Sequence, residues 1–299
     1  MEKINKSVVI CALARDCEDA LHKNIPAVEE LRGRFVRSSV VIVENDSVDS
    51  TKAILNNWSL THSNVEIISK DYSTLTLPAP TTDNPYPGTS MDRIEKMAFY
   101  RNIYLDWIFS HNKNFDLVIV IDIDIKSFNV TEVVTSILRA PEKWGGIFAN
   151  GYTDTRIFSK VIYKMYHDMF AFCEEFPTNK PYFTFGEFFK QKKNMNSKLS
   201  KNKFLPVLSA FGGIGIYKFE AIDGLRYKTV ENGDQYLQAV CEHVLFNLDI
   251  IKRDYQCFIS RDMNVYYGES EKLIVLRNLI PLWLFKMLCL LVKFRKLKE

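Results

Sequence analysis

The sequence lacks the motifs that mark several large enzyme classes. Its 299 residues contain no Walker A lysine motif, no Gly-x-Ser-x-Gly elbow and no cysteine or histidine spacing typical of zinc. Gly212, Gly213 and Gly215 approach a dinucleotide-binding motif, but they do not complete Gly-x-Gly-x-x-Gly and they lie in the second half of the chain. Close backbone approach or tight strand packing explains these glycines better.

The sequence also lacks a strong charge excess. It has 39 Lys and Arg against 36 Asp and Glu, which gives +3 and predicts no nucleic-acid partner. Residues 286–299 hold five basic side chains and one acid, a net charge of +4, so the rest of the chain carries −1. The basic excess therefore belongs to the C-terminal segment.

No hydrophobic run is long enough to span a bilayer. The longest, residues 279–292, has 14 residues and is interrupted by Lys286, whereas a spanning helix needs about 20. On a helical wheel Lys286, Lys293 and Lys296 fall within about 80° of one another, with apolar side chains around the rest. This pattern favours a helix on an anionic membrane surface. The alternative is a helix packed on the core or on a second subunit.

The cysteines show no disulfide framework. The six are scattered without a Cys-x-x-Cys pair, which is typical of reduced core residues. The N-terminal residues show no apolar signal region and no cleavage site. We therefore expect a cytoplasmic protein, peripheral at the inner face of a membrane.

Strand and helix patterns alternate over the first 125 residues. Short apolar runs predict buried parallel strands at residues 7–13, 40–43, 65–68 and 115–121. Helical patterns follow from Asp16 or Cys17 to about Arg34, after Thr51, and over residues 91–109. The fold class predicted is α/β, with a mostly parallel, doubly wound sheet. Residues 72–90 contain four prolines and are interpreted as a lid or binding loop.

The second half has a looser pattern. No linker is visible, so we expect one domain over residues 1–272 and an amphipathic basic tail over residues 273–299. The elements expected are a helix at 131–138, a strand at 146–150, an aromatic helix at 163–176, an exposed polar excursion at 183–203, a strand at 207–217 and a helix at 233–248.

Two carboxylates, Asp122 and Asp124, directly follow the most apolar strand. Because burying ionised groups without partners is costly, both should lie at the carboxyl edge of the sheet, where α/β folds bind ligands. In extended chain they share a face about 6–7 Å apart. Such an Asp-x-Asp (DxD) pair suits Mg²⁺ or Mn²⁺ shared with a diphosphate. The alternative is a solvated strand end.

Several of these features together resemble a GT-A-fold glycosyltransferase that uses a nucleotide sugar. They are the first strand with its Ala14-Arg15-Asp16 ending, the acidic turn from Glu44 to Thr51 after the second strand, and the Asp122/Asp124 pair. A more specific resemblance is to the fungal capsule (cryptococcal) mannosyltransferase family. It rests on four segments in the expected order: residues 93–102, Gly145-Gly146, Phe211-Gly212-Gly213 and residues 241–244. The resemblance covers about residues 7–265.

The resemblance implies roles for individual residues. Ala12, Arg15, Glu44 and Asp46 would line the base and ribose pocket, and Gly213 would approach the donor sugar. Asp124 would bind Mn²⁺ or Mg²⁺ directly, and Asp122 would contact ribose or metal-bound water. Arg93 and Arg101 are eight residues apart, within about 80° on a helix, so both can face a diphosphate. Their alternative is a solvated or ion-paired helix face.

The pair Glu242-His243 is the next candidate for chemistry. Glu242 would be the base that deprotonates an acceptor hydroxyl, or the residue that holds the acceptor in place. Asp234 and Glu187 are further candidates for the base. His243 would be a third metal ligand or a phosphate contact. The alternative for the pair is a satisfied polar network inside an apolar helix.

The function implied is metal-dependent transfer of a hexose, mannose among the candidates. The donor would be a nucleoside-diphosphate sugar and the acceptor a glycan or lipid-linked hydroxyl, in surface polysaccharide or glycoconjugate synthesis. One alternative is a sugar-nucleotide pyrophosphorylase, although residues 11–16 lack the glycine-rich loop of those enzymes. The other is a non-catalytic, membrane-docked binding protein.

Overall fold

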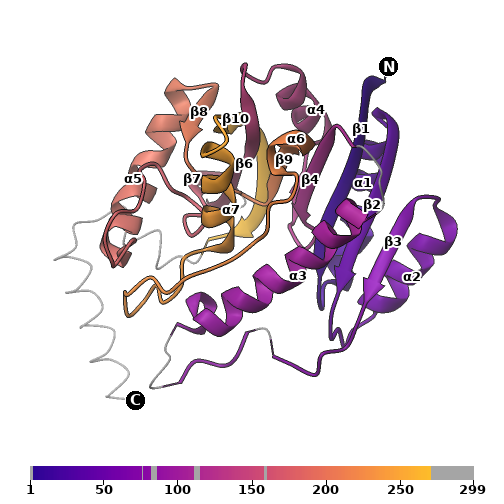
Figure 1. The fold of residues 1–299 in the computed structure, drawn as a ribbon, viewed down its shortest axis with the longest axis horizontal. Coiled ribbons are helices and arrows are strands. Elements are labelled where there is room, and N and C mark those ends of the chain that lie inside the picture. The colour runs from indigo at the N-terminus through magenta and orange to yellow at the C-terminus, as the bar shows by residue number, and fades with distance from the viewer. Residues whose placement is uncertain (1–2, 76, 82–85, 111–114, 158–159, 271–299) are drawn as a thin grey trace.

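The chain forms a mixed α/β structure around one sheet (Figure 1). The computed structural model describes residues 3–75, 77–81, 86–110, 115–157 and 160–270. The strands are β1 (Ile4–Ala14), β2 (Phe35–Glu44), β3 (Val65–Ser69), β4 (Leu117–Asp122), β5 (Ser127–Phe128), β6 (Trp144–Ile157), β7 (Lys160–Tyr166), β8 (Phe204–Val207), β9 (Ile214–Lys218) and β10 (Gln256–Glu269). The helices are α1 (Glu18–Arg32), α2 (Thr51–Thr61), η1 (Pro87–Thr89), α3 (Met91–Ser110), α4 (Val130–Leu138), α5 (Phe185–Lys201), α6 (Phe219–Ile222) and α7 (Glu242–Ile251).

The sheet order explains where a ligand site can form. The strands run β3-β2-β1-β4-β9-β6-β10-β5, with β7 beside β6 and β8 beside β10. Strands β3, β2, β1 and β4 are parallel, so their carboxyl ends meet at one edge. Strand β9 is antiparallel to β4, which brings the glycines before β9 to the same edge. The predicted fold class is confirmed.

Alternating side chains of the strands build two apolar cores, one on each face. Val9 and Cys11 of β1 pack with α3, α6 and α7, whereas Val8 and Ile10 pack with α1, α2 and α4. Figure 1 shows α3 and α7 on the near side of the sheet and α1 behind it. Because successive side chains of a strand point to opposite faces, each strand contributes apolar residues to both cores. The cysteines at positions 11, 17, 173, 241 and 257 are free and buried, as predicted.

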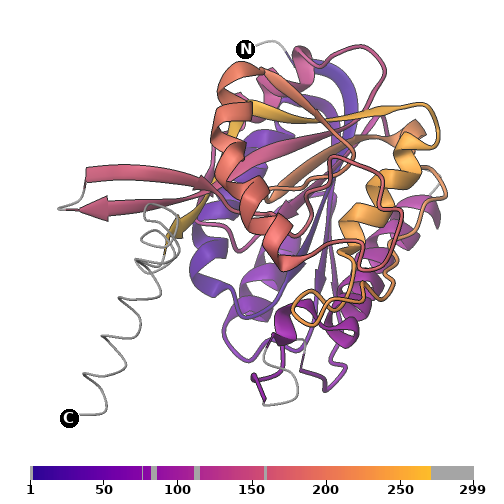
Figure 2. The same cartoon turned by 90° about the vertical axis from the view of Figure 1, so that its left-hand side faces the viewer.

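The elements predicted for the first half are confirmed within a few residues, but several in the second half are wrong. Residues 163–176 do not form a helix, because β7 pairs with β6 up to Tyr166 and the chain then runs without helix through the core. The hairpin of β6 and β7 extends beyond the body of the sheet in Figure 2. Residues 183–203 are mainly helix α5, which buries Met195 and Leu199.

Glycine conformations account for two further corrections. The strand predicted at 207–217 is two strands, β8 and β9, because Gly212 and Gly213 between them have φ of +64° and +88°. The helix predicted at 233–248 begins only at Glu242, and Gly233 has φ of +87°. Left-handed backbone ends regular structure at these points. Strand β10 has no counterpart among the predictions.

The C-terminal tail expected at 273–299 lies outside the described residues, as does the amphipathic helix predicted within it. In the part of the chain that is described, no helix combines the length and the apolar character needed to cross a bilayer.

Candidate active site

A cavity of about 700 Å³ opens at the carboxyl edge of the sheet. Arg15 follows β1 and Asp122 ends β4, so the parallel strands place both residues at this edge. Helix α3 and the start of α7 form another wall. The residues predicted as functional that line it are Arg15, Arg93, Arg101, Asp122, Asp124, Glu242 and His243. The topology therefore brings together most of the residues singled out in the sequence.

Asp122 and Asp124 occupy different environments. Asp122 accepts a hydrogen bond from the Tyr267 hydroxyl at 3.0 Å, and its other oxygen lies 3.7 Å from Arg101 Nη2. Burial raises the pKa of Asp122 to about 7, with Arg101 opposing the shift and Asp124 adding to it. Asp124 is exposed in the turn after β4. One carboxylate is thus held by protein partners and the other faces solvent.

Arg101 forms part of the cavity floor and is only 4% exposed. Its Nε donates to Glu242 Oε1 at 3.0 Å, and its guanidinium stacks over the rings of Phe211 and Tyr227. Glu242 is equally buried at 4%, and its second oxygen accepts from the Cys241 thiol at 3.5 Å. The pair satisfies two charges that would otherwise be costly to bury.

His243 follows Glu242 on the same wall. Its ring stacks on Phe211 with centroids 4.0 Å apart, and neither ring nitrogen has a hydrogen-bond partner among the described residues. The ring is 3% exposed, and burial lowers its pKa well below the usual value, with Arg101 adding to the shift. His243 is therefore a neutral imidazole on the cavity wall, with Nε2 3.8 Å from Glu242 Oε1 and no hydrogen bond to either nitrogen from the described residues.

The two carboxylates predicted in the acidic turn after β2, Glu44 and Asp46, support the cavity without lining it. Glu44 is fully buried and accepts hydrogen bonds from Ser47 N and the Ser69 hydroxyl. Asp46 accepts from the backbone of Tyr72 and Ser73, each at 2.7 Å. Burial would raise the pKa of Asp46, but these bonds and others prevail and lower it.

Arg15 joins this turn to the following loop. Its Nη1 donates to the Thr74 carbonyl at 3.1 Å and lies 3.8 Å from Asp46 Oδ2. The loop predicted from its prolines therefore runs beside the cavity, where Leu75 and Leu77 line it. Other parts of this loop lie outside the described residues.

The two arginines of α3 differ in how freely they face the cavity. Arg93 Nη1 donates to the Gly88 carbonyl at 2.9 Å, and its buried Nε has no partner within the described ranges. Arg101 is committed to Glu242 and Asp122. Asn102, the next residue, exchanges hydrogen bonds with the backbone of Tyr227 and is structural.

Other predicted residues lie away from the cavity wall. Ala12 is fully buried in the core on the α1 side of the sheet. Gly213 accepts from Asp122 N through its carbonyl, and an added Cβ would lie 2.7 Å from the Tyr267 hydroxyl oxygen. Asp234 accepts from the backbone of Tyr236 and Leu237 and shapes a turn. Glu187 caps α5 with Thr184.

Sequence reasoning missed several residues of the cavity, among them Asp168 and Tyr267. Asp168 accepts from Gly212 N at 3.0 Å, and burial raises its pKa. Tyr267, on β10, holds Asp122 and packs against the ring of His167 with centroids 4.2 Å apart. Asp168 lay inside the segment predicted as a helix, and Tyr267 lay in the strand that was not predicted. The only hint in the sequence was the glycine pair next to them, since Gly212 contacts Asp168 and Gly213 lies beside Tyr267.

The carboxylates of Asp122 and Asp124 fit a divalent cation that takes most of its ligands from substrate phosphates and water. Across the described ranges no group of three or more His, Cys, Asp or Glu side chains is placed to bind a metal, so His243 does not complete a protein triad. The pair at the end of β4 offers hard carboxylate oxygens. One or two carboxylates plus substrate phosphates and water is a usual arrangement for Mg²⁺.

Three solved structures are similar to this chain at low sequence identity. The mannosyltransferase PcManGT from Pyrobaculum calidifontis, in complex with GDP-Man and Mn²⁺, is 11% identical over 90% of this chain and 59% of its own, with a TM-score of 0.48. TarS from S. aureus with UDP-GlcNAc is 11% identical over 89% and 59%, with a TM-score of 0.46. Glucosyl-3-phosphoglycerate synthase from Mycobacterium tuberculosis, with Mn²⁺, UDP and phosphoglyceric acid, is 13% identical over 91% and 73%, with a TM-score of 0.41.

This chain spans about three fifths of the length of the first two of these proteins. No curated protein sequence matches it. The profile of the family described as "Cryptococcal mannosyltransferase 1" matches residues 7–249, most of the chain and the whole of the cavity except Tyr267. The chain therefore belongs to the cryptococcal mannosyltransferase 1 family of glycosyltransferases, which confirms the resemblance seen in the sequence.

Proposed function

We propose that this protein transfers a hexose from a nucleoside-diphosphate sugar to a hydroxyl of a glycan or glycolipid, in surface polysaccharide or glycoconjugate synthesis. Membership of its family favours mannose as the sugar. The observation that carries the proposal is one cavity at the carboxyl edge of the sheet that combines Asp122 and Asp124 with Arg93 and Arg101. Carboxylates for a cation and guanidiniums for phosphate are what a metal-complexed diphosphate requires.

The hard part of sugar transfer is the negative charge that develops on the departing diphosphate. Arg93, with a buried Nε that lacks a protein partner in the described structure, is the side chain best placed to accept part of that charge. Asp124, with Asp122 beside it, would hold Mn²⁺ or Mg²⁺. The cation supplies Lewis-acid stabilisation of the leaving group when bound.

The acceptor hydroxyl needs a carboxylate within hydrogen-bond reach if the reaction inverts configuration. Glu242 is our candidate, because it lines the cavity and Asp234 does not. Its ion pair with Arg101 fixes its orientation, which favours a role in holding the acceptor. The neutral nitrogens of His243 would contact the donor or the acceptor.

We further propose that the basic tail holds the enzyme at an anionic membrane surface. The support is its sequence alone: an apolar stretch at 279–292 with Lys286, Lys293 and Lys296 on one side. A variant truncated before Ile280 should no longer sediment with anionic vesicles. If it sediments as the full chain does, the tail is not the anchor.

The function is tested by slow hydrolysis of the donor. We expect the full chain, with Mn²⁺, to release nucleoside diphosphate from one member of a panel of nucleotide sugars, and EDTA to stop the release. A thermal-shift screen with nucleoside diphosphates and Mn²⁺ provides a second readout. No stabilisation and no hydrolysis across the panel would favour the non-catalytic alternative.

A further inference from the structure

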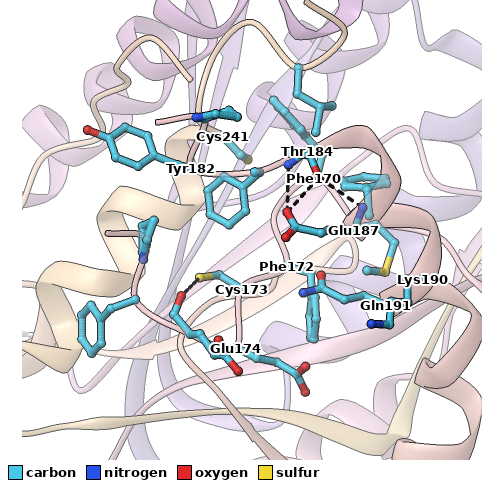
Figure 3. Close-up of a pocket in the computed structure, with 18 of the residues that line it drawn as sticks. Phe170, Phe172, Cys173, Glu174, Tyr182, Thr184, Glu187, Lys190, Gln191 and Cys241 are labelled. Atoms are coloured by element: carbon cyan, nitrogen blue, oxygen red, sulfur yellow. Dashed lines mark hydrogen bonds between the residues drawn. The ribbon is translucent and has the colours of Figure 1, made fainter. Parts of the chain in front are cut away.

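A second cavity, of about 630 Å³, adjoins the active-site cavity. It lies between residues 169–184, helix α5 and residues 237–241, and Figure 3 shows the side chains that surround it. Phe170 and Cys241 line both cavities, so the two spaces share a wall. Cys241 directly precedes Glu242, which places this wall beside the proposed acceptor-binding carboxylate.

Aromatic and amide side chains dominate the lining. Phe176 is 51% exposed although it is a large apolar side chain, and Tyr182 and Phe188 are half-buried. Gln191 and Asn194 of α5 add amide groups that both donate and accept. Flat apolar faces beside bidentate polar groups suit a sugar ring, which presents C–H faces and a rim of hydroxyls.

The charges of this lining disfavour a phosphorylated ligand. Glu174, Glu175 and Glu187 face the cavity, together with Lys190 and Lys198. Lys198 is already paired with both oxygens of Glu174. The lining therefore has no excess of positive charge, and no arginine is among its residues within the described structure. A phosphate would meet uncompensated carboxylates there, whereas a neutral sugar would not.

The walls are held in place before any ligand binds. Asn232 is fully buried and donates to the carbonyls of Phe183 and Leu237, while it accepts from Phe183 N at 2.9 Å. The Thr184 hydroxyl donates to Glu187 at 2.8 Å, and Glu187 N donates back at 3.3 Å, which fixes the start of α5 (Figure 3). A volume of 630 Å³ falls within the range of about 300–1,000 Å³ typical of ligand sites.

We infer that this second cavity is the acceptor subsite and that it takes a neutral glycan residue. The acceptor ring stacks on the aromatic lining and presents its hydroxyl past Phe170 and Cys241 to the active-site cavity. This inference rests on the proposed function. It adds that the immediate acceptor is a carbohydrate without phosphate at the bound residue.

Transfer kinetics test the inference. Phe176→Ala and Gln191→Ala should each raise the KM for a mannose disaccharide acceptor by about tenfold or more, while the rate of donor hydrolysis stays within about twofold of wild type. Leu60→Ala and Asn56→Ala, on the exposed face of α2, are the matched controls and should change neither quantity. Unchanged acceptor KM with intact donor hydrolysis would overturn the inference and leave the proposed function standing.

Binding gives a readout that needs no turnover. In saturation-transfer NMR, methyl α-D-mannopyranoside should contact the wild-type chain in the presence of excess GDP or UDP with Mn²⁺, and the contact should weaken in both variants. Displacement of the glycoside by the nucleotide would assign it to the active-site cavity and overturn the inference. Tighter binding of mannose 6-phosphate than of methyl α-D-mannopyranoside would contradict the inference that the ligand is neutral. If wild type binds the glycoside but hydrolyses no donor, the second cavity binds carbohydrate, but the proposed function fails and the acceptor role fails with it.

Discussion

Arg101 and Glu242 form a buried ion pair between residues 141 positions apart, with Nε 3.0 Å from Oε1. The pair ties α3 to the first turn of α7 across the floor of the active-site cavity. The same guanidinium reaches towards Asp122 at 3.7 Å. The Arg101 guanidinium therefore links Glu242, the carboxylate proposed for the acceptor, to Asp122, one of the two carboxylates proposed for the metal.

Breaking this pair should cost stability. Arg101→Leu leaves Glu242 buried without its partner, so we expect the free energy of unfolding to fall by about 3–5 kcal/mol. Denaturant titration measures the change. The double variant Arg101→Leu/Glu242→Leu should recover part of the loss. Arg226→Leu, which breaks the exposed pair with Asp106, is the control and should cost less than about 1 kcal/mol. Equal losses from the two arginines would contradict the argument.

The role of Glu242 can be separated from its structural pairing. If Glu242 is the general base, Glu242→Gln should lower kcat by about two orders of magnitude or more. If it positions the acceptor, the main change should be a higher acceptor KM. Asp234→Asn is the comparison, because its carboxylate is used by the backbone of Tyr236 and Leu237, and transfer should change little. A large loss of kcat in Asp234→Asn, with none in Glu242→Gln, would make Asp234 the functional carboxylate and Glu242 the structural one.

Removal of Asp124 should abolish metal-dependent activity without unfolding the protein. Asp124 is exposed after β4, so Asp124→Ala should leave the melting temperature nearly unchanged. Donor hydrolysis and transfer should fall by about two orders of magnitude or more, because the leaving group would lose its cation. Asp106→Ala, an exposed carboxylate on α3, should retain activity. Full activity of Asp124→Ala, unaffected by EDTA, would remove the metal site from the proposal.

The first half of the fold was predictable because local pattern and tertiary structure agree there. Apolar runs such as the one before Asp122, alternating with helical patterns, favour buried parallel strands, and parallel strands bring their polar ends to one edge. The sequence order of the motifs therefore located most of the cavity. The pairing of Arg101 with Glu242 was not predictable, because it depends on α7 packing against α3 far along the chain.

The second half resisted prediction because long-range pairing overrides local preference there. Tyr163, Tyr166 and Phe170 have helical spacing, yet Tyr163 and Tyr166 pair with β6 as part of a strand. Tyr267 enters the site only because β10 lies beside β6 and the turn after β4. No motif in the sequence around Asp168 marks it as a residue of the site. Its partner, Gly212, was noticed as a glycine but not as a backbone donor.

Gly212 should tolerate no side chain. Its φ is +64°, and an added Cβ would lie 2.2 Å from the Ala149 carbonyl oxygen, which is a backbone atom and not the end of a flexible side chain. Gly212→Ala should therefore destabilise the protein and displace the backbone donor that holds Asp168. Gly186→Ala, in helix α5 with nothing near the added Cβ, is the control and should stabilise by up to about 1 kcal/mol. Thermal unfolding of the two variants should shift in opposite directions.

The buried ring of His243 should make the protein sensitive to acid. In the unfolded chain His243 takes up a proton near its usual pKa of about 6.5, but in the folded chain burial and the charge of Arg101 keep it neutral. Below pH 6.5 the unfolded state therefore binds more protons, and stability falls as the pH drops, by up to about 1.4 kcal/mol per pH unit. His243→Phe, which retains a ring to stack on Phe211, should remove this contribution. Denaturant titrations of both proteins between pH 7.5 and about 5 measure the difference. Parallel stability curves would mean that His243 takes up its proton in the folded protein as it does in the unfolded chain, and the neutral-imidazole assignment would then be wrong.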